Sequence, residues 1–165
     1  MIQKAKKHHL DSIMACYKAT IQQMHELNIF QWDDSYPTLS IIEEDIKKED
    51  FFVYVEHNEV LACICINTEQ HPTYSDVKWT FEGDVLVVHR LAIHPKSQGK
   101  GLAKQMMQFV ENQVQILNYA GIRLDTFIEN PLAINLYNKI GYNQLETVSF
   151  KNRTYHCFDK KIIQK

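Results

Sequence analysis

A glycine-rich turn between an apolar run and a helical pattern most constrains what this chain can fold into. Residues 85–93 are mostly apolar and predict a strand, and from Leu102 the apolar residues recur at helical spacing. Two glycines in the turn, Gly99 and Gly101, let the backbone approach a ligand closely. The first turn of the helix adds unpaired N–H groups and the positive end of its dipole. The segment therefore predicts an anion site, most often one for a phosphate.

Positive charge gathers at this turn although the chain as a whole is nearly neutral. Lys96, Lys100 and Lys104 surround it, whereas the net charge is −2 from 18 basic and 20 acidic side chains. A general nucleic-acid binder usually carries a strong basic excess. We therefore expect no nucleic acid as a partner and regard the basic cluster as a local feature.

Length and composition predict one globular domain over residues 1–165, with 45% hydrophobic and 23% charged residues. No Cys-x-x-Cys pair occurs, so the cysteines are expected to be buried and reduced. The N-terminus lacks the apolar core of a signal peptide, and no apolar run approaches the roughly 20 residues that span a bilayer. We expect a cytoplasmic protein with no membrane partner. No spacing of metal ligands stands out.

The periodicity of the chain predicts an α+β domain without repeats or linkers. Ser40 and Glu43 resemble a capping box, and Asn130 followed by Pro131 is a strong helix start. Gly141 is expected to end that last helix. Residues 68–84 are polar and turn-rich, which predicts a long loop. We expect helices over 10–27, 40–48, 102–118 and 130–141, and strands over 1–5, 51–56, 60–67, 85–93, 122–128, 144–150 and 153–161.

Two common phosphate-binding motifs do not fit the turn. A Walker A loop would need glycine at position 94 and serine or threonine at position 101, where His94 and Gly101 stand. A dinucleotide fingerprint would need a third glycine at position 104, which is Lys104, and three consecutive strands precede the turn. A nucleotide-binding oxidoreductase is therefore disfavoured.

The pattern Gln98-x-x-Gly101-x-Ala103 resembles motif A of the GNAT family of acetyl-CoA-dependent N-acetyltransferases. A second segment resembles the family's motif B, in order Asn130, Pro131, Ala133, Tyr137, Asn138, Lys139, Ile140, Gly141 and Tyr142. The resemblance covers nearly the whole chain. It implies a mixed, twisted sheet of six to seven strands flanked by about four helices. It also implies a splay between the two central parallel strands, 85–93 and 122–128.

The same resemblance implies acetyl-CoA as co-substrate. The pantetheine arm would pair with the backbone of the strand, and Asn130 would be its side-chain partner. The pyrophosphate would lie on the N–H groups of the turn and of the first helical residues. The coenzyme-binding residues are thus expected to be Leu91, Ala92, Ile93, Gln98, Gly99, Lys100, Gly101, Leu102, Ala103, Lys104 and Asn130.

Acyl transfer to an amine requires proton removal, because an amine with a pKa near roughly 10 is protonated at neutral pH. It also requires donors for the oxyanion, for which a backbone N–H near Ile93 is expected, and a proton for the leaving thiolate. Tyr137 is the expected acid; its other interpretation is an aromatic ring packed on the sheet. His89 shares a strand face with Leu91 and Ile93. The resemblance to arylalkylamine acetyltransferases of the same superfamily, which place histidines on this strand, makes it a candidate for a water-linked proton path; its other interpretation is an ordinary strand histidine. Glu82 and Asp84, which precede the strand, are alternative bases or solvated loop acids.

The resemblance implies that the aromatic and acidic segment 28–37 walls the acceptor pocket. Trp32 and Tyr36 could hold a cationic amine through cation–π contacts, or could anchor the segment to the core. The expected function is transfer of acetyl to a primary amine of a small molecule, by direct attack in a ternary complex. The alternatives are acetylation of a protein N-terminus or lysine, and a non-catalytic acyl-CoA-binding regulatory domain. A homodimer is expected from the resemblance alone.

Overall fold

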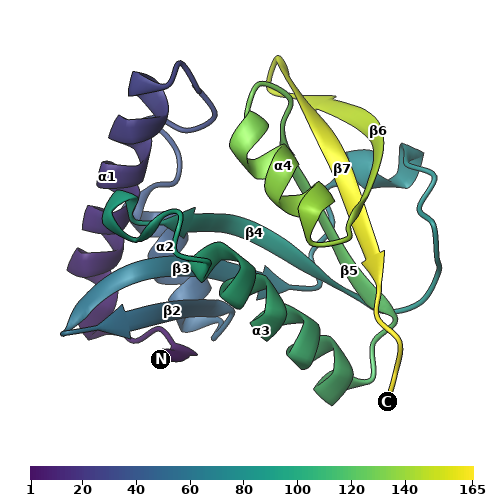
Figure 1. Ribbon diagram of the computed structural model, residues 1–165, viewed down its shortest axis with the longest axis horizontal. Helices are drawn as coiled ribbons and strands as arrows, with labels where there is room; N and C mark the ends of the chain where they lie inside the picture. Colours follow the sequence, from purple (N-terminus) through teal and green to yellow (C-terminus); the bar gives the residue numbers. More distant parts are fainter. The chain divides into compact units, whose positions relative to one another are not determined.

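Seven strands form one mixed sheet in the order β1-β2-β3-β4-β5-β7-β6. The computed structural model describes all 165 residues (Figure 1). Four α-helices accompany the sheet: α1 (Leu10–Glu26), α2 (Leu39–Lys47), α3 (Leu102–Leu117) and α4 (Pro131–Lys139). The strands are β1 (Ile2–Lys4), β2 (Phe51–Glu56), β3 (Glu59–Asn67), β4 (Val85–Ile93), β5 (Gly121–Phe127), β6 (Asn143–Phe150) and β7 (Arg153–Lys161). The predicted α+β class and mixed sheet are confirmed.

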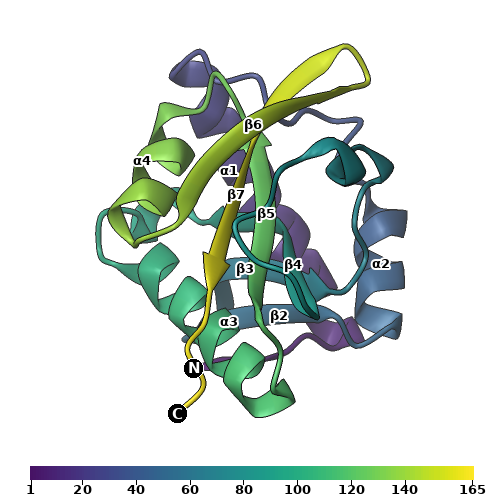
Figure 2. The ribbon, with the colours of Figure 1, turned by 90° about the vertical axis from the view of Figure 1, so that its right-hand side faces the viewer.

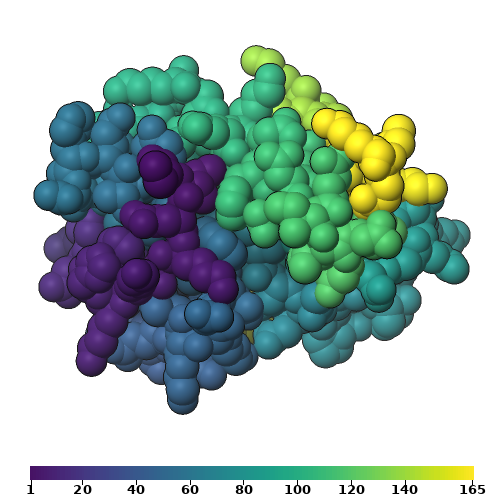
Figure 3. Space-filling view, turned by 90° about the horizontal axis from the view of Figure 1, so that it is seen from below, coloured from purple at the N-terminus to yellow at the C-terminus, as the bar shows by residue number.

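The chain divides into two compact units, each with its own contacts. The first unit comprises residues 1–66 and 89–107, and the second comprises residues 67–88 and 108–165. Strand β4 and helix α3 each run from one unit into the other. The terminal residues lie at the surface (Figure 3), with Met1 and Ile163 each 83% exposed. No helix has both the length and the apolar character needed to cross a bilayer.

The first unit packs two helices on an antiparallel hairpin. Strand β2 pairs with β1 and β3, with Phe51 opposite Cys65. Its core combines Ile13 of α1, Ile42 of α2 and the strand residues Phe51 and Val53, all fully buried. Cys16, Cys63 and Cys65 join this core, and Cys157 is buried in the second unit. All four cysteines are free thiols, as predicted.

The second unit is built on the only parallel pair. The first residues of β4 pair in parallel with β5, from Val85 opposite Gly121 to Val87 opposite Arg123. Strand β5 then pairs antiparallel with β7, and β7 with β6. Helix α4 lies beside β7 (Figure 2). The ring of Tyr137 on α4 packs against the ring of Phe158 on β7, with 5.4 Å between the ring centroids.

Local hydrogen bonds explain where the helices begin. Asn130 caps α4 as predicted, since its side chain accepts from the amide of Ala133 at 3.1 Å. The predicted capping box of α2 is wrong. The cap is Thr38, whose extended backbone brings its hydroxyl within 3.3 Å of the amide of Ile41, so Ser40 lies inside the first turn. The predicted loop 68–84 contains a short 3₁₀ helix, η2 (Pro72–Asp76).

Candidate active site

The turn between β4 and α3 adopts a backbone that only glycine accommodates easily. Gly99 has φ +73° and Gly101 has φ +80°, in the left-handed region that is costly for side chains with a Cβ. A Cβ built on either residue would meet nothing within 4 Å. The glycines are therefore required by the turn itself, and the space in front of them is open.

A row of six unused amides follows from this conformation. None of the N–H groups from Gly99 to Lys104 donates a hydrogen bond within the protein, and the helical ladder begins when the amide of Gln105 donates to Gly101. The amide of Gln98, which was also predicted to bind phosphate, instead donates to the carbonyl of Pro95 at 3.2 Å. Successive free amides at a helix N-terminus form a concave binding site for an anion.

The end of β4 is held by side chains. The carbonyl of Ile93 accepts from Gln98 Nε2 at 3.0 Å and from Thr20 Oγ1 at 3.2 Å. The Thr20 hydroxyl has a single proton and a shorter contact, 2.8 Å, to the carbonyl of Cys16, so Gln98 is the steady donor to the Ile93 carbonyl. The expected pairing of the pantetheine arm with the backbone of Ile93 stays a prediction.

The lysines at the turn do not all face the same way. Lys96 forms an ion pair with Glu59, which lowers the pKa of that exposed carboxyl. Lys100 and Lys104 form no ion pair within the protein. Two of the three predicted cations are therefore available to an anion at the free amides.

Arg90 interrupts the regular geometry of β4. Its φ is +55°, a left-handed conformation inside a strand and uncommon for a residue with a side chain. The alternation of side chains depends on extended backbone at every position. Because Arg90 interrupts this alternation, the prediction that His89 shares one face with Leu91 and Ile93 does not hold across Arg90. His89 itself is half-buried.

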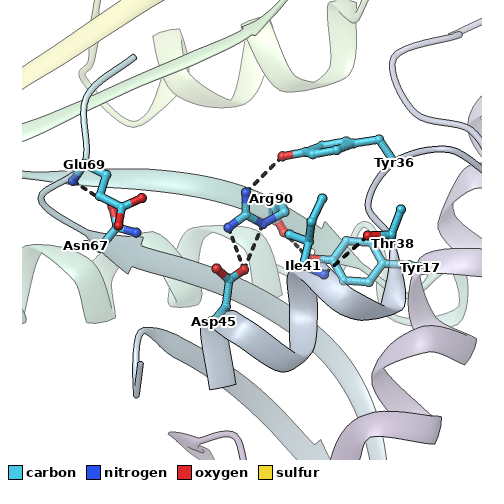
Figure 4. A network of polar contacts seen from close by, with 8 residues as sticks. All are labelled: Tyr17, Tyr36, Thr38, Ile41, Asp45, Asn67, Glu69 and Arg90. Carbon is cyan, nitrogen blue, oxygen red and sulfur yellow. Dashed lines mark hydrogen bonds and ion pairs between the residues drawn. The ribbon is translucent and has the colours of Figure 1, made fainter. Parts of the chain in front are cut away.

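The Arg90 side chain links three parts of the first unit (Figure 4). Its Nε and Nη2 donate to Asp45 Oδ2 of α2 at 3.1 and 2.5 Å, and its Nη1 donates to the hydroxyl of Tyr36 at 2.9 Å. The side chains of Arg90 and Asp45 are only 12% and 9% exposed. Loss of one partner from a buried ion pair strongly destabilises the folded protein, because the remaining charge is left buried and unpaired.

Trp32 and Tyr36, which were predicted to contact the acceptor amine, have contacts inside the protein. Trp32 packs edge-on against the ring of Tyr17 at 5.6 Å and lies against the first core. The hydroxyl of Tyr36 accepts from Arg90. Both contacts anchor the segment between α1 and α2, which is the second of the two interpretations given above.

In the second unit, Tyr137 presents a phenol without a hydrogen-bond partner in the protein. The ring is 5% exposed and packs between Tyr142 at 5.8 Å and Phe158 at 5.4 Å. Burial raises the pKa of Tyr137 well above its ordinary value, and the nearby charge of Asp125 raises it further. The phenol therefore keeps its proton at neutral pH and can donate it. The side-chain oxygen of Asn130 caps α4, so that atom has a structural task.

Several polar contacts within the two units were missed at the sequence level. The hydroxyl of Tyr74 donates to Asp125 Oδ2 at 2.5 Å in the second unit, and Asp45 pairs with Arg90 in the first. The alternation of 122–128 places Asp125 on the face of Arg123 and Phe127, opposite Leu124, which gives no signal of a partner inside the protein. The partner of Asp125 lies 51 residues away, which no local pattern reveals.

A mixed sheet with a parallel β4–β5 pair and a row of free amides at the start of α3 defines an N-acetyltransferase of the GNAT type. The model of the acetyltransferase (GNAT) family matches residues 7–142, and the chain belongs to this family. The uncharacterized N-acetyltransferase YesJ of Bacillus subtilis (strain 168) is 24% identical over 156 residues, which is 92% of this chain and 84% of the relative.

Solved structures share the fold. A GNAT-family acetyltransferase from Streptococcus agalactiae 2603 superposes with a TM-score of 0.86 at 23% identity, over 100% of this chain and 96% of the other. A GNAT-family acetyltransferase from Listeria monocytogenes 4b F2365 gives a TM-score of 0.74 at 19% identity, over 98% and 94%. The chain is therefore an acetyltransferase by family, and it shares its fold with these structures.

Proposed function

We propose that this chain transfers the acetyl group of acetyl-CoA to a primary amine of a small molecule, by direct attack in a ternary complex. The observation that carries the proposal is the row of six free amides from Gly99 to Lys104. The first N–H groups of any helix lack partners within it, and here the row extends back through the turn to Gly99. A set left without acceptors at a helix N-terminus, with Lys100 and Lys104 beside it, suits a diphosphate.

The coenzyme's pantetheine arm would then follow the end of β4. The N–H groups of Leu91 and Ile93 are the proposed donors, because the carbonyl of Ile93 already accepts from the Gln98 side chain. An extended arm beside a strand binds in the manner of an added strand. The N–H of Ile93 is also the proposed donor to the developing oxyanion.

Proton transfer completes the chemistry. Tyr137 is the proposed acid for the leaving thiolate, because its phenol is protonated at neutral pH and has no partner in the protein. The phenol proton would pass to the sulfur as the C–S bond breaks. His89 remains a candidate for a proton path through water. Trp32 and Tyr36 remain candidates for contact with the acceptor, in addition to their anchoring contacts.

The proposal is tested by measuring binding and turnover with separate assays. Calorimetric titration with acetyl-CoA should show one site per chain, and titration with NADH should show none. A thiol-detecting reagent should then report CoA release that depends on an added amine from a panel of small amines. Binding of acetyl-CoA without release by any small amine, but with release by a peptide, would replace the proposal by protein acetylation.

A further inference from the structure

Helix α4 has few side chains that could fix its position. It is nine residues long, and Tyr137 is its only buried residue. A helix this short is not stable on its own, so contacts with the rest of the protein decide where it lies. Asn130 caps its N-terminus. The position of Tyr137, near the other end, therefore depends on what holds the C-terminal turn of the helix.

A half-buried lysine holds that turn. Lys160 of β7 donates from its Nζ to the carbonyl of Ile140, the C-cap of α4, at 3.0 Å, and to Glu111 Oε1 of α3 at 2.7 Å. The last carbonyls of a helix carry partial negative charge, so a cation is favourable there. The side chains of Lys160 and Glu111 are 25% and 16% exposed, and salt therefore screens their attraction less than that of a surface pair.

The same ammonium group lies against the aromatic residue that follows the helix. Lys160 Nζ is 5.3 Å from the centre of the Tyr142 ring, within the range of a cation–π contact. Gly141, at φ +90°, lies beside the same side chain, because a Cβ built on it would be 3.9 Å from Lys160 Cε and Nζ. The Lys160 side chain thus covers the turn 140–142 that ends α4.

Tyr137 is packed between two neighbours of this lysine. Phe158 lies two residues before Lys160 on β7, so both side chains point to the same face of the sheet. The Tyr137 ring lies 5.4 Å from the ring of Phe158 and 5.8 Å from the ring of Tyr142. The amide of Tyr142 also donates to the carbonyl of Tyr137 at 3.0 Å. Lys160 therefore contacts the ring and the helix end that fix Tyr137.

We propose that Lys160 is a positioning residue for Tyr137. It fixes the last turn of α4 and the Tyr142 ring, and so presents the Tyr137 phenol in one orientation. This inference rests on the proposed function, in which Tyr137 gives its proton to the leaving sulfur. Lys160 itself takes no part in the proton transfer. Glu111 balances the charge of Lys160, so that no unpaired ammonium group is buried under the helix.

A double-mutant cycle on turnover separates positioning from general stability. Lys160→Met keeps an unbranched apolar stem and removes the ammonium group. With 2-phenylethylamine as the probe amine, we expect kcat to fall about tenfold or more, because a small misplacement of a reacting group is costly. The Kd for acetyl-CoA should stay at its wild-type value. In the Tyr137→Phe background the same substitution should leave kcat unchanged, because the hydroxyl that Lys160 positions is already absent.

Lys161→Met is the matched control for the cycle. Lys161 is the next residue of β7, its side chain is exposed, and it forms no ion pair within the protein. Its substitution removes the same charge from the same strand and should leave kcat unchanged. Equal losses of kcat for Lys160→Met in the two backgrounds, or an equal loss in Lys161→Met, would overturn the inference.

Removing both charges guards against a variant that fails to fold. Lys160→Met alone leaves the Glu111 carboxylate half-buried without its cation, which is destabilising. Glu111→Gln combined with Lys160→Met should recover the melting temperature. Its kcat should remain as low as in Lys160→Met, because the contacts with Ile140 and Tyr142 are still missing. Recovery of kcat together with the melting temperature would overturn the inference.

An NMR measurement reads the position of Tyr137 without turnover. The NOE between the rings of Tyr137 and Phe158, assigned by its absence in Tyr137→Phe, should weaken in Lys160→Met and keep its wild-type intensity in Lys161→Met. An unchanged NOE in Lys160→Met would overturn the inference even where the wild-type enzyme does not turn over the probe amine. Absent turnover alone counts against the proposed function.

Discussion

The hydroxyl of Tyr17 donates a hydrogen bond of 2.5 Å to the carbonyl of Arg90 (Figure 4), the residue at which β4 leaves the extended conformation. A left-handed backbone at a residue with a side chain costs about 1–3 kcal/mol and persists only where its surroundings hold it. Tyr17 lies on α1 and is 1% exposed, so its ring is fixed by the core. Helix α1 therefore holds the bend of the strand that precedes the proposed coenzyme site.

Removing the Tyr17 hydroxyl should destabilise the protein measurably. Tyr17→Phe leaves the Arg90 carbonyl without this donor, which costs about 1–3 kcal/mol for a buried group. Urea denaturation should show a lower free energy of unfolding with an unchanged m-value. Tyr54→Phe is the control in the same unit, because the Tyr54 hydroxyl makes no hydrogen bond within the protein. Equal losses in both variants would contradict the role of the Tyr17–Arg90 bond.

The Arg90–Asp45 pair should show strong coupling in a double-mutant cycle. Asp45→Ala alone leaves a buried guanidinium unpaired and should cost about 3–5 kcal/mol. Arg90→Met combined with Asp45→Ala removes both charges and should cost less than the sum of the single changes. The exposed pair Lys4–Glu49, at 3.1 Å, is the comparison and should show negligible coupling. Additive losses at Arg90 and Asp45 would show that the pair contributes no mutual stabilisation.

Filling the turn with a side chain should abolish tight coenzyme binding. Gly101→Val forces a β-branched residue into φ +80° and places methyl groups in the open space before the free amides. We expect the Kd for acetyl-CoA to rise at least about tenfold, which is 1.4 kcal/mol. Gly141→Val is the matched control, since its φ is +90° and it ends α4 in the second unit. Similar affinities of the two variants would place the coenzyme elsewhere.

Loss of the Tyr137 hydroxyl should slow turnover more than it weakens binding. Tyr137→Phe keeps the ring contacts with Tyr142 and Phe158, and removes the proposed proton donor. We expect kcat to fall by about 10²-fold with a Kd for acetyl-CoA within threefold of wild type. Tyr142→Phe is the control, because its buried hydroxyl has no partner and its removal leaves no polar group unpaired. A wild-type kcat in Tyr137→Phe would remove the acid from the mechanism.

The sequence predicted those features that depend on neighbours along the chain. The strand 85–93, the Asn130 cap and the glycine turn each follow from residues within a few positions, and each is confirmed. The bend at Arg90 was not predictable, because arginine has no preference for a left-handed backbone and the contacts that hold it come from Tyr17 and Asp45. The pairing of Tyr74 with Asp125 likewise depends on the sheet, which brings distant segments together.

The four thiols should be unreactive until the protein unfolds. Burial raises the pKa of Cys65 to about 12 and that of Cys157 to about 12. The reactive species is the thiolate, and a pKa near 12 leaves roughly one thiol in 10⁴ ionised at pH 8. Iodoacetamide labelling followed by mass spectrometry should therefore be slow in the native protein and should report four modified cysteines in urea. Because access to the buried sulfurs requires opening of the structure, the native labelling rate should rise in Tyr17→Phe by about tenfold for each 1.4 kcal/mol of lost stability. Labelling of the native enzyme as fast as of a free thiol would show that a cysteine is exposed in solution.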